Sequence, residues 1–339
     1  MPWQAEEIRS FITDNIQNHP KDIVAVTAER FSVSRTTVHR HLSRLIQDRK
    51  IIKSGTTKRA VYSVAGTKNK ELALGITPDI EKHKIWEGLR PDFAALNKNV
   101  YDICEYGFTQ IFNNAVEHSA GSAVLIATRW DKDIVTISIT DNGSGIFKKI
   151  KTAFNLADER ESILQLSKGK LTTDPEHHIG QGLFFVSRCF DEIHTTANGL
   201  YYSRLNLEND WFIESRNGKT QSGTYVSMKI STDSPRNLKE IFDSFISPET
   251  RDLDKTQIWV ELSKAAHESY ISRAQAKRLL TGLEKLKEIT FDFKNVTTVG
   301  QGFVDEVFRV FKNKHPGTQI KYTNTNDDVK FMIDRGLPK

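Results

Sequence analysis

The chain has 339 residues, 38% of them hydrophobic and 27% charged, which is ordinary for a globular protein and long enough for two or three domains. No apolar run approaches the ~20 residues that a membrane helix needs, and "MPWQAEEIRS" lacks the apolar core of a signal peptide. Two isolated cysteines form neither a disulfide framework nor a zinc site, so we expect a cytoplasmic protein.

The net charge of +5 is concentrated at the N-terminus. Residues 1–66 hold 11 of the 48 basic residues and 6 of the 43 acidic ones, which leaves 37 of each sign in the rest of the chain. A compact basic module on a neutral body predicts a polyanionic partner for that module.

Residues 1–66 show three helical patterns, at 5–16, 22–31 and 35–50, followed by the extended runs "IIK" and "AVYSV" around "SGTTKR". Ser34 is a suitable N-cap for the third helix. Helix, helix, helix, hairpin is the order of a winged helix-turn-helix, whose third helix enters the major groove of duplex DNA. We expect DNA contacts from one face of that helix and from the hairpin tip: Arg35, Thr36, Thr37, His39, Arg40, Arg44, Lys58 and Arg59. The alternative is a charged, solvated face on a small helical domain.

Residues 67–98 are expected to form a linker or helical connector. This segment is broken by two prolines and contains no evident pair of phosphoacceptor helices. It therefore argues against a histidine kinase, and the lone His83 is expected to be a solvated side chain.

Four polar or glycine-rich pieces punctuate residues 99–232. Asn114 follows a helical apolar pattern, "DNGSGI" (141–146) follows a strand, "IGQGLFFVSRCF" (179–190) begins a helix, and "SGT" (222–224) precedes a strand. An amide oxygen can hold a Mg²⁺ ion that bridges phosphates. Glycines at a helix N-terminus let phosphate approach the backbone N–H groups and the positive end of the helix dipole. Each piece is weak evidence alone, but the four in this order predict a nucleotide site.

In this order the pieces resemble the GHKL superfamily of ATPases, which includes gyrase-type ATPases and histidine kinases. The resemblance implies an α+β (Bergerat) sandwich that binds Mg²⁺ and ATP. It implies that Asp141 accepts a hydrogen bond from the adenine amino group, that Asn114 binds Mg²⁺, and that residues 147–178 form a mobile lid. It further implies ATP contacts from Gly143, Gly145, Gly180, Gly182 and Thr224. Because the lid segment is polar and rich in lysine, we also expect Lys168 and Lys170 to reach the γ-phosphate.

Gln110 departs from the GHKL pattern. In hydrolysing members a glutamate one helical turn before the magnesium-binding asparagine activates water, and here glutamine stands at that place. A general base is typically worth ~10²–10⁴-fold in rate. We therefore expect ATP binding with weak hydrolysis, either because the protein is natively a nucleotide-gated switch or because a glutamate has been replaced to trap ATP. A surface residue without a role does not fit the spacing of Gln110 from Asn114.

After an expected connector at 233–255, residues 256–339 alternate strand and helix patterns, which predicts a small α/β domain. The stretches "SRAQAKRLL", "DFKNV" and "GQGFVDEVFRVF" resemble a STAS-like domain of unknown function that often follows GHKL ATPases. STAS antagonists of anti-sigma kinases carry a phosphorylatable serine before the helix that begins here near Phe303. The sequence "VGQGF" has no hydroxyl there, so we favour a docking or dimerisation domain with a possible protein partner.

The leading hypothesis is an ATP-gated DNA-binding switch, such as a transcriptional regulator, in which ATP closes the lid and promotes a homodimer. The first alternative is a serine/threonine kinase of the anti-sigma type that acts on a STAS partner, against which Gln110 and "VGQGF" both count. The second is a defence protein that uses the same ATP clamp with DNA as its trigger.

Overall fold

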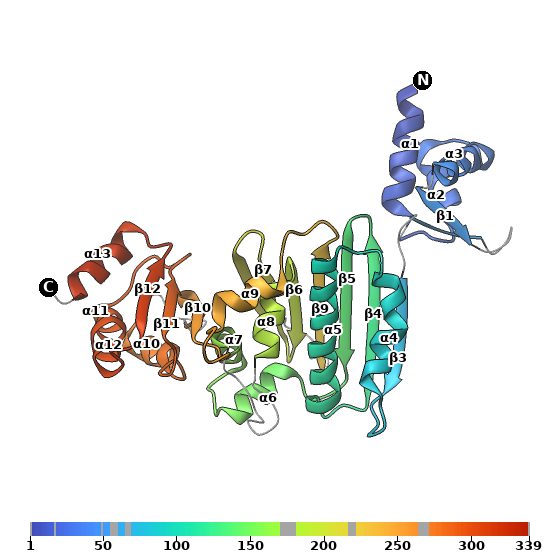
Figure 1. Cartoon of the computed structure of the whole chain (residues 1–339). Coiled ribbons are helices and arrows are strands. Elements are labelled where there is room, and N and C mark those ends of the chain that lie inside the picture. The colour runs from blue at the N-terminus through green and yellow to red at the C-terminus, as the bar shows by residue number, and fades with distance from the viewer. Residues whose placement is uncertain are drawn as a thin grey trace. The chain divides into compact units, whose positions relative to one another are not determined.

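The structure is a computed structural model that describes residues 2–16, 18–48, 50–54, 60–64, 69–169, 181–215, 222–263 and 271–337 (Figure 1). The chain forms two compact units, and each is described by itself. The first comprises residues 1–71 and 127–136, and the second comprises residues 72–126 and 137–339. None of the described helices is long and apolar enough to cross a membrane.

The N-terminal module contains the predicted elements in the predicted order. Helices α1 (Pro2–Asn15), α2 (Ile23–Phe31) and α3 (Arg35–Gln47) precede an antiparallel hairpin of β1 (Ile51–Ser54) and β2 (Val61–Val64). Ser34 caps α3 as expected, because its Oγ accepts the Thr37 N–H at 3.1 Å. The three helices and the hairpin share one small core, built mainly from Ile8, Ile12, Ile16, Ile23, Val38, Leu42, Leu45, Ile51 and Tyr62.

The central domain is built on a seven-stranded sheet in the order β3-β4-β5-β9-β6-β7-β8. Its strands are β3 (Asn69–Gly75), β4 (Ala123–Asp131), β5 (Ile134–Asp141), β6 (Glu192–Ala197), β7 (Leu200–Leu205), β8 (Asp210–Ser215) and β9 (Thr224–Ser231). The pairs β6–β7, β6–β9 and β7–β8 are antiparallel. Helices α4 (Lys82–Phe93), α5 (Lys98–His118) and α8 (Gly182–Cys189) lie against one face of this sheet (Figure 1).

Both segments expected to be connectors contribute to this central layer. β3 pairs at the edge of the large sheet, and Trp86 on α4 packs against Phe108 on α5 with ring centroids 5.2 Å apart. In the second segment, helix α9 (Leu238–Phe245) stacks Phe242 on Phe185 at 4.1 Å. The apolar residues in these segments are thus anchors of the central domain.

The segment expected to be a mobile lid forms two packed helices over its described part. Helices α6 (Ile146–Ala153) and α7 (Glu159–Lys168) bury Phe147, Ile163 and Leu164 in the core of the second unit. Residues 170–180, which include Lys170 and Gly180, lie outside the described residues.

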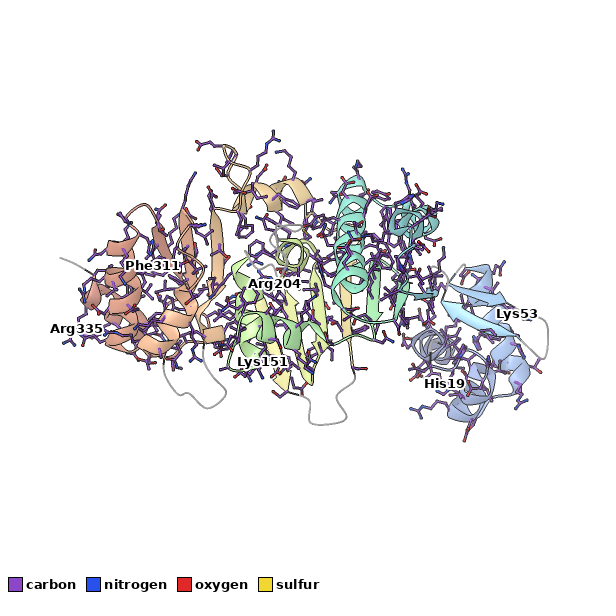
Figure 2. All side chains as sticks on the ribbon, turned by 90° about the horizontal axis from the view of Figure 1, so that it is seen from below. His19, Lys53, Lys151, Arg204, Phe311 and Arg335 are labelled. Atoms are coloured by element: carbon purple, nitrogen blue, oxygen red, sulfur yellow. The ribbon has the colours of Figure 1, made fainter. Side chains whose placement is uncertain are left out.

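The C-terminal domain has a parallel sheet in the order β10-β11-β12, formed by Lys255–Trp259, Glu288–Asp292 and Gln319–Thr323. Its helices are α10 (Arg273–Leu280), α11 (Gln301–Val304), α12 (Lys312–Lys314) and α13 (Asp327–Gly336), with a π-helical stretch at Asp305–Phe311 that joins α11 to α12. Helix α10 begins with a capping box, in which Gln275 Oε1 accepts the Ser272 N–H at 2.9 Å. One hydrophobic core runs from α6–α8 into this domain, and side chains fill both parts of the unit (Figure 2).

Candidate functional site

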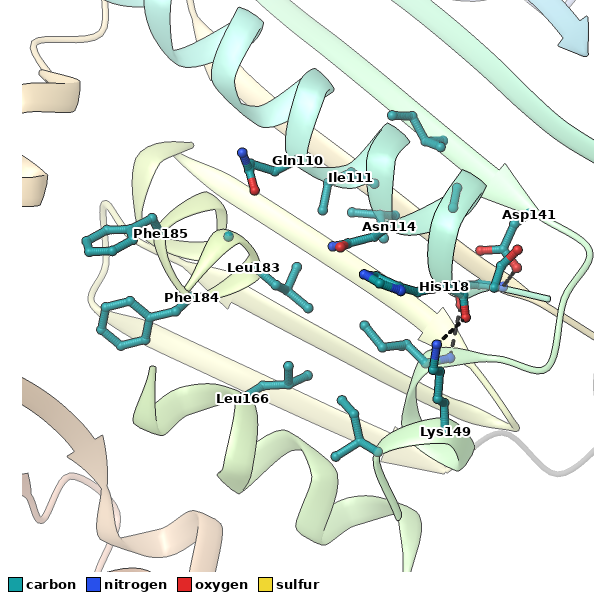
Figure 3. Close-up of a pocket in the computed structure, with 18 of the residues that line it drawn as sticks. Gln110, Ile111, Asn114, His118, Asp141, Lys149, Leu166, Leu183, Phe184 and Phe185 are labelled. Atoms are coloured by element: carbon teal, nitrogen blue, oxygen red, sulfur yellow. Dashed lines mark hydrogen bonds between the residues drawn. The ribbon is translucent and has the colours of Figure 1, made fainter. Parts of the chain in front are cut away.

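A cavity of ≈ 490 Å³ lies between α5, the end of β5, and helices α6, α7 and α8 (Figure 3). Helix α5 lines it with residues four apart in the sequence, Tyr106, Gln110, Asn114 and His118, which fall on one face of a helix. Asp141 and Lys149 lie at one end of the cavity, and Phe184 and Phe185 lie at the other (Figure 3). The volume is within the ≈ 300–1,000 Å³ typical of small-molecule sites.

Asp141 is the only acidic residue among the described lining residues, and it is 7% exposed. Its Oδ1 accepts the Gly143 N–H at 2.9 Å and the Thr224 N–H at 3.2 Å. Burial raises the pKa of Asp141, and these backbone hydrogen bonds oppose the rise. A buried carboxylate that two strand ends hold in place is suited to accept a hydrogen bond from a ligand at this end of the cavity.

The turn after Asp141 depends on glycine for packing. A Cβ on Gly143 would come within 2.0 Å of the Ser119 carbonyl oxygen, and one on Gly223 within 1.9 Å of the Asp141 carbonyl oxygen. Gly145 has φ +83° and precedes α6, whose first N–H, from Ile146, is accepted by Thr224 Oγ1 at 3.0 Å. Gly145 and Thr224 line the cavity, whereas Gly143 does not, so its role in this structure is contact with the end of α5.

Gln110 on α5 and Gly182 on α8 are neighbours in the lining of the cavity. Gly182 is the first residue of α8, and a Cβ there would come within 2.2 Å of Gln110 Oε1. The N-terminal N–H groups of a helix are unpaired within the helix and favour anions. The predicted base position therefore lies beside the predicted phosphate position.

Asn114 lies between these two ends on α5, and its side chain has no hydrogen-bond partner among the described residues. Those residues contain no cluster of three His, Cys, Asp or Glu side chains that could hold a metal. The amide oxygen of Asn114 is a ligand type that Mg²⁺ accepts, and Mg²⁺ is commonly bound by few protein groups together with substrate phosphates and water.

Sequence reasoning missed His118 and Lys149. Lys149 Nζ donates a hydrogen bond to the His118 carbonyl at 2.6 Å, and both side chains line the cavity at the Asp141 end (Figure 3). The sequence could have indicated His118, because it follows Asn114 by four residues and therefore falls on the same face of the helix. Lys149 had no distinct signal, because "FKKIK" offers three lysines and only the fold selects one.

Lys168 was expected at the phosphates, but the structure places it elsewhere. It is 4% exposed and does not line the cavity, and its Nζ donates at 2.8 Å to the carbonyls of Arg278 and Thr281 in the C-terminal domain. In this structure Lys168 joins the two domains of the second unit.

Six of the eight predicted DNA contacts lie on α3. The side chains of Arg35, Thr36, His39, Arg40 and Arg44 are exposed. Thr37 is half-buried with its hydroxyl 2.9 Å from Ser34 Oγ, so it supports the cap, and Arg44 pairs with Asp48 at 3.2 Å. Lys58 and Arg59 lie outside the described residues.

Comparison with known proteins adds one family match. Residues 275–330 match a family model described as a STAS-like domain of unknown function, within the C-terminal domain where the sequence predicted one. No curated protein matches the chain. The match runs from within α10 to within α13 and includes β11 and β12 of the small parallel sheet, but it assigns no activity.

Proposed function

We propose that the protein is an ATP-gated, DNA-binding switch that acts as a transcriptional regulator. The central domain would bind Mg²⁺ and ATP in the manner of GHKL proteins, and the N-terminal module would bind duplex DNA as a winged helix. One observation carries the nucleotide part: a single cavity gathers Gln110 and Asn114 of α5 with Asp141 of β5, Gly182 of α8 and Thr224 of β9.

The ends of the cavity suggest how ATP would lie. Asp141 would accept a hydrogen bond from the adenine amino group, and its buried setting makes that bond selective, because water competes poorly there. The phosphates would lie toward the N-terminus of α8 at Gly182, with Asn114 holding Mg²⁺ between the two ends. The bound Mg²⁺ would offset the negative charge of the phosphates.

Weak hydrolysis follows from the side chains at the phosphate end. Gln110 is not a base, and the one described carboxylate in the cavity, Asp141, lies at the opposite end (Figure 3). The imidazole of His118 also lies at the Asp141 end of the cavity (Figure 3). This arrangement favours retention of ATP over turnover, as a switch requires.

Three features support the DNA part. The N-terminal module holds the excess positive charge of the chain, α3 exposes basic side chains, and a hairpin follows it. We infer that ATP, but not ADP, promotes a homodimer and that the dimer sets the spacing of two winged helices on DNA.

Calorimetric titration of the full chain tests the nucleotide assignment. We expect Mg-ATP to bind wild-type protein, to be preferred over Mg-GTP, and to bind the Asp141→Asn variant at least ~10-fold more weakly, as the loss of a charge-assisted hydrogen bond implies. Asparagine retains an oxygen for the Gly143 and Thr224 N–H groups, so the variant should keep its fold. Equal ATP affinity in the variant would contradict the assignment.

A further inference from the structure

Lys168 joins the last turn of α7 to the C-terminal end of α10. Its buried Nζ donates to the carbonyls of Arg278 and Thr281, which belong to the last turn and the C-cap of α10. Backbone carbonyls at a helix C-terminus lack partners within the helix and carry partial negative charge, so they suit a buried amino group. Glu161 in the first turn of α7 adds an ion pair to Arg278 at 2.9 Å.

Arg188 makes a second connection, from α8 to β10. Its guanidinium donates to the carbonyl of Ser167 on α7 at 3.2 Å and to that of Gln257 on β10 at 3.3 Å. It is 3% exposed and lies 3.5 Å from the centre of the Phe184 ring. It has no ion pair with any described carboxylate, and its Nε has no hydrogen-bond partner in the described structure. The guanidinium is held by carbonyls, the Ser187 hydroxyl and two aromatic rings, and a buried cation without a carboxylate partner is costly to retain.

Both connections begin beside the cavity. Leu166, two residues before Lys168, lines the cavity from α7. Phe184, whose ring stacks on Arg188, lines it from α8 (Figure 3). A movement of either helix that changes the cavity therefore also moves a group that holds the C-terminal domain.

We propose that Lys168 and Arg188 are positioning residues that tie two walls of the cavity to the STAS-like domain, so that nucleotide binding and docking of that domain stabilise each other. The inference rests on the proposed binding of ATP. Arg188 lies on the helix whose N-terminus would face the phosphates. Charges interact over longer distances in a poorly solvated interior than in water, so the phosphates would supply negative charge that Arg188 otherwise lacks.

Reciprocity sets the expected effects. If nucleotide stabilises docking by a given factor, docking must raise nucleotide affinity by the same factor, and such factors are typically about 5–150. A partner that binds the STAS-like domain and loosens it from α7 and α8 should accordingly release nucleotide.

Hydrogen exchange of the full chain with and without saturating Mg-ATP provides the test. We expect ATP to slow exchange of the α10 and β10 amides at least about fivefold in wild-type protein. In Arg188→Met and Lys168→Met, which keep much of the side-chain length, this ATP-dependent slowing should be lost and ATP affinity should fall by the same factor. Lys277→Met, on the exposed face of α10, is the matched control and should behave as wild type.

The outcomes separate this inference from the proposed function. ATP binding measured by calorimetry without any change in exchange at α10 and β10 overturns the coupling and leaves the nucleotide site intact. Variants that retain the full ATP-dependent slowing overturn the roles of Lys168 and Arg188. Absence of ATP binding in wild-type protein overturns the proposed function, and the coupling with it.

Discussion

Gln110 Oε1 lies over Gly182, so close that a methyl group on Gly182 would approach it to 2.2 Å. One residue comes from the middle of α5 and the other begins α8. Their contact brings the amide that stands at a general-base position to the helix N-terminus where phosphate is expected. The proposed phosphate binding and the proposed weak turnover therefore depend on the same pair of residues.

Gln110→Glu should convert the switch into an ATPase. A carboxylate at this position could take a proton from water, and we expect the hydrolysis rate at saturating Mg-ATP to rise ~10²-fold or more. Gln181→Glu adds the same charge to the cavity lining next to Gly182 and serves as the control. Phosphate release measured for the two variants distinguishes a base from a charge, and equal rates would mean that Gln110 does not occupy the base position.

Alanine at Gly223 should lower the stability of the fold, whereas alanine at Gly182 should mainly weaken ATP binding. Gly223 has φ +93° and its new Cβ would meet backbone, so Gly223→Ala should lower the free energy of unfolding by more than about 2 kcal/mol. At Gly182 the new Cβ meets the movable end of Gln110, so Gly182→Ala should change stability by less than about 1 kcal/mol yet weaken ATP binding. Urea unfolding and calorimetry of both variants check this, and a destabilised Gly182→Ala would show that Gln110 cannot move aside.

Lys168 should make stability depend on pH. Burial lowers its pKa to about 7, against the opposing influence of Glu284 and Glu161, whereas an unfolded lysine titrates near ~10.4. Between these values the unfolded chain binds the extra proton, so the free energy of unfolding rises with pH. Relative to Lys168→Met, wild-type protein should gain stability from pH 7 to 9, by at most about 1.4 kcal/mol per pH unit. If urea unfolding shows the same change in the free energy of unfolding with pH for both proteins over this range, Lys168 stays charged in the folded state.

The local patterns of the sequence predicted most of the elements. The helical pattern at 35–50 with its Ser34 cap placed α3, and the alternating strand and helix patterns after residue 256 predicted the small α/β domain. The sequence analysis also expected Asn114, Asp141, Gly182 and Thr224 to lie in one site, because their order along the chain resembles that of GHKL ATPases. The GHKL and winged-helix assignments themselves stay predictions.

Tertiary partners decided what the sequence could not. Lysines in a polar stretch look alike, so Lys149 at the cavity and Lys168 at the domain junction could not be told apart before packing was known. The resemblance implied a ligand contact for Gly143, and the position of Ser119 shows that a side chain at Gly143 would also clash with the end of α5. Prolines in the first segment expected as a connector suggested a break in the fold. In the structure, Trp86 packs against Phe108 of the next helix and Phe242 of the second connector packs against Phe185 of α8.

The DNA assignment predicts salt-sensitive binding with two classes of contact. Log affinity should fall linearly with log salt, because basic side chains release counterions from DNA. Arg35→Ala or Arg40→Ala should cost ~1–3 kcal/mol on the preferred sequence and relax the preference, whereas Lys58→Ala or Arg59→Ala should weaken all sequences about equally. Lys277→Ala, an exposed residue of the C-terminal domain, is the control. Unchanged DNA affinity after deletion of residues 1–66 would falsify the assignment.

The claim that ATP gates DNA binding is tested most directly by ATP affinity measured with and without saturating two-site duplex DNA. A ligand shifts a conformational equilibrium only through its different affinities for the two states, and coupling between two sites is reciprocal. We predict that DNA changes ATP affinity by at least about fivefold and that ATP changes DNA affinity by the same factor. Identical ATP affinities in the two conditions would contradict the account, because the cavity and the basic module would then be independent parts of one chain.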